Sequence, residues 1–145
     1  MTTLEQIIEW WKVDTVIDNT DLGNESIKIP KLHAKYYEQY CKEKLILTKS
    51  EHEYYTLAKI KNDYYRGRMS REELAQYGWE QFQLRVVKED LEFYIKADPD
   101  LQAALMKLSL QQEKVSFLKE IVNSLHGRGF QISSAISFIK WTNGG

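Results

Sequence analysis

Lysine, arginine and tyrosine are concentrated in one stretch of the chain, residues 31–71. This stretch holds ten of the twenty Lys and Arg residues, against five acids, and seven of the nine tyrosines. Proteins that bind single-stranded nucleic acid combine cations along the phosphates with aromatic rings on which bases stack. The stretch therefore fits a surface for single-stranded nucleic acid. The plainer alternatives are a solvated basic helix face and tyrosines buried in a helical core.

The densest part of this stretch is Lys59 to Arg68, which carries four cations in ten residues. On a continuous helix Lys59 lies about 200° around the axis from Lys61, so the two lysines cannot press on the same phosphate. Either a strand passes along the edge of the helix, or one lysine serves a neighbouring subunit. The candidate DNA-binding residues are Lys59, Lys61, Tyr64, Tyr65, Arg66 and Arg68.

Patterns for catalysis, cofactors and metals are missing from the 145 residues. The three histidines form no metal-ligand spacing, and the single cysteine, Cys41, lies on an apolar helix side and is expected in the core. No phosphate-binding loop or dinucleotide fingerprint is present. No apolar run approaches the roughly 18 to 20 residues of a membrane span. We expect neither an enzyme nor a cofactor, metal site or membrane segment.

The elements that must position these residues are helices. Gly and Pro are scarce, with seven and two residues, and apolar side chains recur at helical spacing, so we predict an all-α fold. Capping boxes at Thr2-x-x-Glu5 and Thr48-x-x-Glu51 predict two helix starts, Pro30 predicts a first turn, and Ser70 and Gly78 bound a short helix. The first expected helix ends near Val13. Four more are expected over residues 30–47, 48–65, 70–77 and 79–97.

The C-terminal part is expected to join subunits. Asp98-Pro99 predicts a helix start, and an apolar heptad seam interrupted only by Gln111 follows. Gly127 and Gly129 are expected to end this helix before a last amphipathic one. An intramolecular core is the alternative, but we favour an interface, with residues 1–97 as the DNA-binding region and 98–145 as the oligomerisation region. The expected interface residues are Leu101, Leu105, Leu108, Val115, Leu118, Val122, Leu125, Phe130, Ile132, Ile136 and Ile139.

Three segments carry a resemblance to a known family. Val16 to Leu22, Lys59 to Arg68 with its Asp-Tyr-Tyr-x-Gly-Arg core, and Arg128 to Ile132 stand in the order and at the spacing of the UvsY family. These proteins are the recombination mediators of T-even-type bacteriophages. The resemblance covers essentially the whole chain.

The resemblance implies a small helical protein that forms a ring of six or seven subunits through its C-terminal part. It implies binding to single-stranded DNA without sequence preference, and contacts with the phage single-stranded DNA-binding protein and the phage RecA-type recombinase. The mediator helps the recombinase to replace the first protein on DNA, in the cytoplasm of the infected bacterium. It is not itself an enzyme.

Two basic residues that the family uses for DNA binding fall on Lys59 and Lys61. The second is Lys where the family prototype has Arg, and Arg66 stands where the prototype has a small polar residue. Because Lys cannot make the forked contact of Arg to phosphate, we expect Lys61 to bind more weakly and Arg66 to compensate.

The rival function is a helical oligomeric scaffold whose basic belt binds an acidic protein and never meets DNA. Base stacking requires exposed rings, whereas a protein-binding belt works with Lys and Arg alone. A double-stranded DNA reader is a third alternative, but the sequence has no helix-turn-helix signature.

Overall fold

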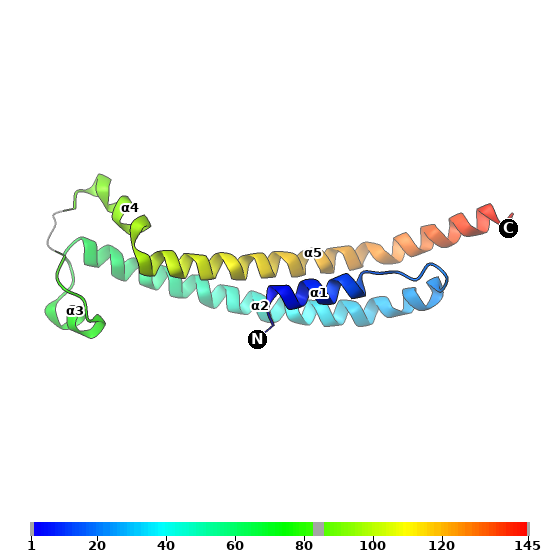
Figure 1. Cartoon of the computed structure of the whole chain (residues 1–145), viewed down its shortest axis with the longest axis horizontal. Coiled ribbons are helices and arrows are strands. Elements are labelled where there is room, and N and C mark those ends of the chain that lie inside the picture. The colour runs from blue at the N-terminus through cyan, green and yellow to red at the C-terminus, as the bar shows by residue number, and fades with distance from the viewer. Residues whose placement is uncertain (1, 83–85, 145) are drawn as a thin grey trace. The chain divides into compact units, whose positions relative to one another are not determined.

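The computed structural model describes residues 2–82 and 86–144, and all of its regular structure there is helical (Figure 1). The helices are α1 (Leu4–Asp14), α2 (Leu22–Tyr65), α3 (Arg71–Tyr77), α4 (Lys88–Ala97) and α5 (Pro99–Thr142). The predicted all-α fold is confirmed. Within this described part, none of the helices has a stretch long and apolar enough to cross a membrane.

The chain divides into two compact units that do not follow the predicted boundary at residue 98. Unit 1 consists of Met1–Leu45 and Gln111–Gly145, and unit 2 consists of Ile46–Leu110. The first 12 residues of α5 belong to unit 2 and the other 32 belong to unit 1, and α5 is paired with α2 in each unit. The predicted boundary at residue 98 thus falls inside unit 2, and the division into a DNA-binding and an oligomerisation region stays a prediction.

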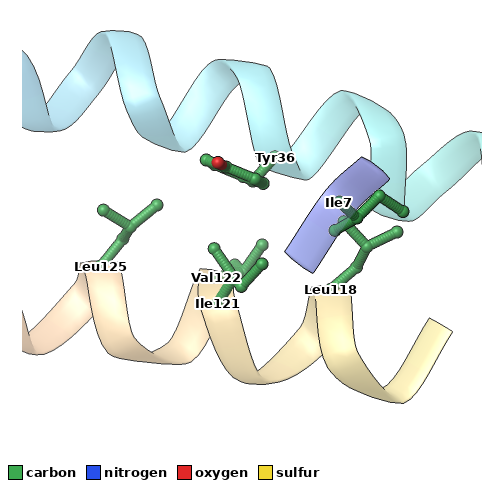
Figure 2. Packing of buried hydrophobic residues seen from close by; sticks show 6 residues of the cluster. All are labelled: Ile7, Tyr36, Leu118, Ile121, Val122 and Leu125. Carbon is green, nitrogen blue, oxygen red and sulfur yellow. The ribbon is translucent and has the colours of Figure 1, made fainter. Parts of the chain in front are cut away.

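The core of unit 1 is built by α1, α2 and α5. Figure 2 shows its side chains pointing toward one another from the three helices. Tyr36 is completely buried, its ring meets Trp11 edge to face, and its hydroxyl donates to Asp14 Oδ2 over 2.7 Å. The buried cluster consists of Ile7, Tyr36, Leu118, Ile121, Val122 and Leu125.

This core contains many of the residues predicted for the subunit interface. Most of the heptad seam is covered within one chain, where α5 packs against α1 and α2, which supports the intramolecular alternative for these side chains. The buried members of the predicted interface are Leu101, Val115, Leu118, Val122, Leu125 and Ile132. Leu108 and Ile136 are half-buried. Only Leu105, Phe130 and Ile139 are exposed.

Gln111, the polar residue of the seam, bonds within the chain. Its Nε2 donates to the Glu43 carbonyl oxygen over 2.9 Å and to Glu43 Oε2 over 2.7 Å. The Lys114 ammonium lies 3.4 Å from the same carboxylate oxygen. All three residues are buried, so this network fixes the register of α5 on α2 inside unit 1.

Several predicted helix ends are confirmed by their hydrogen bonds. Asp98 Oδ1 accepts from the Leu101 N–H over 3.0 Å, and Ser70 Oγ accepts from the Glu73 N–H over 3.2 Å. Gly67 follows α2 and Gly78 follows α3, both at positive φ as a left-handed turn requires. The capping box of α1 is displaced by one residue from the prediction and uses Thr3 with Gln6.

Other predicted ends are wrong. Helix α2 runs through Thr48 without a break, because Leu45, Ile46 and Leu47 continue the helix and leave the backbone there already hydrogen-bonded. Pro30 lies inside α2, which starts eight residues earlier. The helix predicted over 79–97 begins only at Lys88; residues 83–85 of that prediction lie outside the described residues.

Helix α5 also continues past Gly127 and Gly129, where an end was predicted, because neither glycine adopts a positive φ. The intervening Arg128 is buried and donates to the carbonyl oxygens of Asp14 and Thr15, over 3.1 and 2.7 Å. These carbonyls are at the C-terminal end of α1, where a cation is favourable. Cys41, expected in the core, is exposed.

Candidate nucleic-acid interface

The predicted DNA-binding residues all belong to unit 2. Some of them are exposed, and the others are already bonded to neighbouring residues of the same unit. Lys59 is on the outside of α2 with 83% of its side chain exposed, and the Asp63 carboxylate is 3.9 Å away. Arg66 and Arg68 are exposed in the turn that follows α2. Within residues 2–82 and 86–144 neither arginine has an ion pair. These three cations are accessible to phosphate.

Lys61 points into unit 2 and is already paired. Its ammonium lies 2.8 Å from Asp100 Oδ2 and 3.1 Å from Asp98 Oδ2. It also lies 4.1 Å from the centre of the Trp79 ring, which is a cation–π distance. Only 5% of Lys61 is exposed. The residue therefore ties the end of α2 to the start of α5 rather than facing solvent.

The same buried group sets the protonation of its members. Burial acts to lower the pKa of the Lys61 ammonium, but hydrogen bonds to Asp100 and Asp98 outweigh it and hold that pKa above its usual value. Burial acts to raise the pKa of Asp98, but hydrogen bonds from Tyr65, the Leu101 N–H and Lys61 hold it below its usual value. Both groups are charged at neutral pH.

The Asp98 carboxylate makes unit 2 sensitive to acid. Since the pKa of Asp98 is lower in the folded than in the unfolded chain, its contribution to stability is complete above about pH 4 and is lost as the pH falls through the folded pKa. We predict that Asp98→Asn, which keeps a capping oxygen, is less stable than the parent at pH 7. The two free energies of unfolding should converge once the pH has fallen below the lowered pKa of Asp98 in the folded chain.

Urea unfolding at a series of pH values measures this difference. The Asp14 carboxyl in unit 1 also has a lowered pKa. The free energy of unfolding of Asp98→Asn should therefore still fall in acid, but by less than that of the parent. A constant difference between parent and variant at every pH would contradict the prediction.

Tyr64 and Tyr65 are part of an aromatic cluster, which consists of Tyr64, Tyr65, Trp79, Phe82 and Tyr94. Neighbouring ring centres in it are 5.0–5.8 Å apart, mostly edge to face. The Tyr64 hydroxyl donates to the Glu80 carbonyl oxygen over 2.9 Å, and the Tyr65 hydroxyl donates to Asp98 Oδ2 over 2.6 Å. The two rings are half-buried and hold unit 2 together, so they are poorly placed to receive bases.

A shallow basic depression lies beside the exposed arginines. It has a volume of about 460 Å³ and is lined by Arg66, Arg68, Val86, Lys88 and Leu91. Its lining thus combines three cations with two apolar side chains. Lys88, too, has no ion pair in the described part of the chain. Phosphate oxygens fit the cations of such a depression, and a sugar or base edge fits its apolar side chains.

Sequence reasoning missed Lys88 and Trp79, because both lie outside the Tyr-rich stretch 31–71. It placed Lys59 and Lys61 on opposite sides of the helix, which the structure confirms. The burial of Lys61 follows from its pairing with the Asp98 and Asp100 carboxylates. The sequence does not show this pairing, because it does not show that α5 starts beside the end of α2. Among residues 2–82 and 86–144, no group of three or more His, Cys, Asp or Glu side chains could hold a metal ion.

Comparisons with known proteins agree with this architecture. A family model described as "Recombination, repair and ssDNA binding protein UvsY" matches residues 10–145. Three crystal structures of the bacteriophage T4 recombination mediator protein UvsY are similar. In lattice types II, IV and I they have TM-scores of 0.87, 0.84 and 0.80, and sequence identities of 23%, 22% and 22%.

These matches extend over nearly complete chains. They cover 99%, 97% and 92% of this chain, and 100%, 99% and 96% of the T4 chains, in the same order. A comparison with curated proteins found no match. The family model covers far more than half of the sequence, and the chain belongs to the UvsY family of recombination, repair and single-stranded DNA-binding proteins.

Proposed function

We propose that this protein binds single-stranded DNA without sequence preference through the basic depression, with Lys59 as a further phosphate contact. The single observation that carries the proposal is the set of three exposed cations, Arg66, Arg68 and Lys88, around one depression. Family membership supports it. Lys59 extends the same positive surface along α2, and contacts of this kind release counterions from the phosphates.

Lys61 has a different role in this proposal. Its ammonium is occupied by Asp98 and Asp100, so it acts as a positioning residue that fixes the end of α2. The turn carrying Arg66 and Arg68 follows directly. Arg66 is then a principal phosphate contact and not merely a substitute for a weaker lysine, because its planar guanidinium grips phosphate at two points.

We further propose that the protein is a recombination mediator of a bacteriophage. It would promote assembly of a RecA-type recombinase on DNA covered by single-stranded DNA-binding protein, in the cytoplasm of the infected host. The support is membership of the UvsY family and the similarity in fold to the T4 UvsY proteins, which are recombination mediators. The role requires binding of DNA and of two proteins, and no catalysis by this chain.

Assembly into a homo-oligomer, a hexamer or heptamer, is the remaining part of the proposal. The end of α5 leaves large apolar side chains exposed, including Phe130, Phe138, Ile139 and Trp141. Exposed apolar side chains of this size are typical of an interaction surface, and a second copy of the chain could cover them. A ring would repeat the basic depression, so that modest contacts combine into tight binding.

The DNA-binding proposal is tested by charge removal. We predict that Arg66→Ala with Arg68→Ala lowers the affinity for an oligo-dT strand and reduces the salt slope by about 1.4 per protomer engaged, since each phosphate contact to a single strand contributes about 0.7. The matched control removes two exposed cations elsewhere in unit 2, Lys49 and Lys107, which both lie 4.0 Å from Glu53. Fluorescence anisotropy across a salt series measures both variants.

Equal losses in the two double variants would contradict the assigned site. A folded parent oligomer, confirmed by light scattering, that fails to bind oligo-dT at low salt would favour the protein scaffold. The mediator function is then measured as the rate at which a RecA-type recombinase forms filaments on strands covered by single-stranded DNA-binding protein, with and without this protein.

A further inference from the structure

Tyr77 and Trp79 form a stacked pair that the DNA-binding proposal does not use. Their ring centres are 4.7 Å apart and the ring planes differ by 20°. Trp79 is also contacted by the Lys61 ammonium at 4.1 Å and by the Tyr64 ring at 5.2 Å, edge to face. Trp79 is half-buried and fixed by these groups, whereas Tyr77 is 41% exposed at the outer end of the pair.

The backbone at the end of α3 places the two rings together. Gly78 has a φ of +69°, the Gly78 N–H donates to the Ala75 carbonyl oxygen over 3.2 Å, and the Trp79 N–H donates to the Leu74 carbonyl oxygen over 3.0 Å. This pattern is a Schellman motif. The turn reverses the chain over the buried Leu74 and holds the Tyr77 and Trp79 rings face to face.

Tyr77 differs from the two tyrosines predicted to stack on bases. The hydroxyls of Tyr64 and Tyr65 are bonded, and their rings lie in the aromatic cluster. In the part of the chain that the structure describes, the Tyr77 hydroxyl has no hydrogen-bond partner. Because one side of its ring is already held against Trp79, little conformational freedom is lost when a further ring stacks on it.

The surrounding charges favour a base over a phosphate at this position. Glu73 is one helical turn before Tyr77 on α3 and is exposed, so a phosphate beside the Tyr77 ring would meet a like charge. An uncharged base has no such penalty. The cations proposed above for the phosphates of the strand, Arg66 and Arg68, belong to the same unit as Tyr77.

We propose that Tyr77 is a stacking platform for one unpaired base of single-stranded DNA, fixed in place by Trp79 and, behind it, by Lys61. The inference rests on the proposed DNA binding and adds a base contact to its phosphate contacts. It also gives Lys61 a second means of supporting DNA binding, because the lysine that pairs with Asp98 and Asp100 is the one that holds Trp79.

The test compares two strands of equal length, a short oligo-dT and an abasic strand that keeps the phosphates and sugars. The parent should bind oligo-dT at least about fivefold more tightly than the abasic strand. Tyr77→Ala should lose most of this preference and keep the parent's salt slope, whereas Tyr77→Phe should keep the preference. The control is Tyr55→Ala, which removes another exposed tyrosine of unit 2 and should behave as the parent.

The outcomes separate this inference from the proposed function. A parent that binds neither strand overturns the proposed DNA binding. A parent that binds oligo-dT, with Tyr77→Ala keeping the full preference over the abasic strand, overturns the stacking platform alone. Circular dichroism melting checks that Tyr77→Ala is folded, and a variant that melts early is replaced by Tyr77→Leu, which fills the position without an aromatic ring.

Discussion

Replacement of Lys61 by methionine is expected to lower the free energy of unfolding by about 3 kcal/mol or more, because it breaks a buried ion pair and leaves Asp98 charged without its cation. Methionine keeps the apolar stem of the side chain, so the loss reports the charge rather than a cavity. Affinity for oligo-dT should fall, while its salt slope stays unchanged. Urea unfolding and anisotropy titrations measure the two effects.

Lys59→Ala is the matched comparison, since the family resemblance assigns both lysines to DNA binding. The exposed Lys59 should give the opposite pattern, with unchanged stability and a salt slope reduced by about 0.7. Lys61→Arg keeps the charge and should restore most of the stability. If Lys61→Met reduced the salt slope and left stability intact, Lys61 would be a phosphate contact and the positioning role would be wrong.

The second large effect is expected in the buried network of unit 1. Glu43→Ala removes the carboxylate that faces the Lys114 ammonium and the Gln111 amide, so a buried charge loses its partner. We predict a loss of about 3 kcal/mol in the free energy of unfolding. Chemical denaturation at neutral pH measures it.

The control for this prediction replaces the whole network with leucines at Glu43, Gln111 and Lys114. Without any buried charge left over, this triple variant should be at least as stable as the parent. A triple variant that is as unstable as Glu43→Ala would show that the loss comes from packing volume rather than from the unpaired lysine.

The sequence predicted those parts of the fold that local chemistry decides. Asp98 before Pro99, Ser70 before Glu73, and Gly78 each satisfy backbone groups with nearby atoms, and these ends are where they were predicted. Thr48 and Gly127 carry the same kind of local signal, but the helices continue through them. There the long contacts of α2 with α5 outweigh a local preference of about 1 kcal/mol.

For the candidate site, the sequence indicated a segment, but not which of its residues are exposed and which are buried. The Lys59 to Arg68 segment was identified from its cations and tyrosines. The burial of Lys61 depends on Asp98 and Asp100, and the stacking of Tyr77 depends on a turn after α3, so neither follows from the spacing of residues on α2. The heptad seam shows the same limit, because apolar spacing does not say whether the covering surface is in the same chain.

The division into a continuous and a discontinuous unit has a consequence for synthesis on the ribosome. Unit 2 is a single segment, Ile46–Leu110, so all of its residues have been made before the last quarter of the chain. Unit 1 must wait, since Arg128 meets Asp14 across 114 residues of sequence. Helix α1 can pack against α2 early, through Trp11 and Tyr36, but its packing is therefore complete only when the second part of α5 has been made.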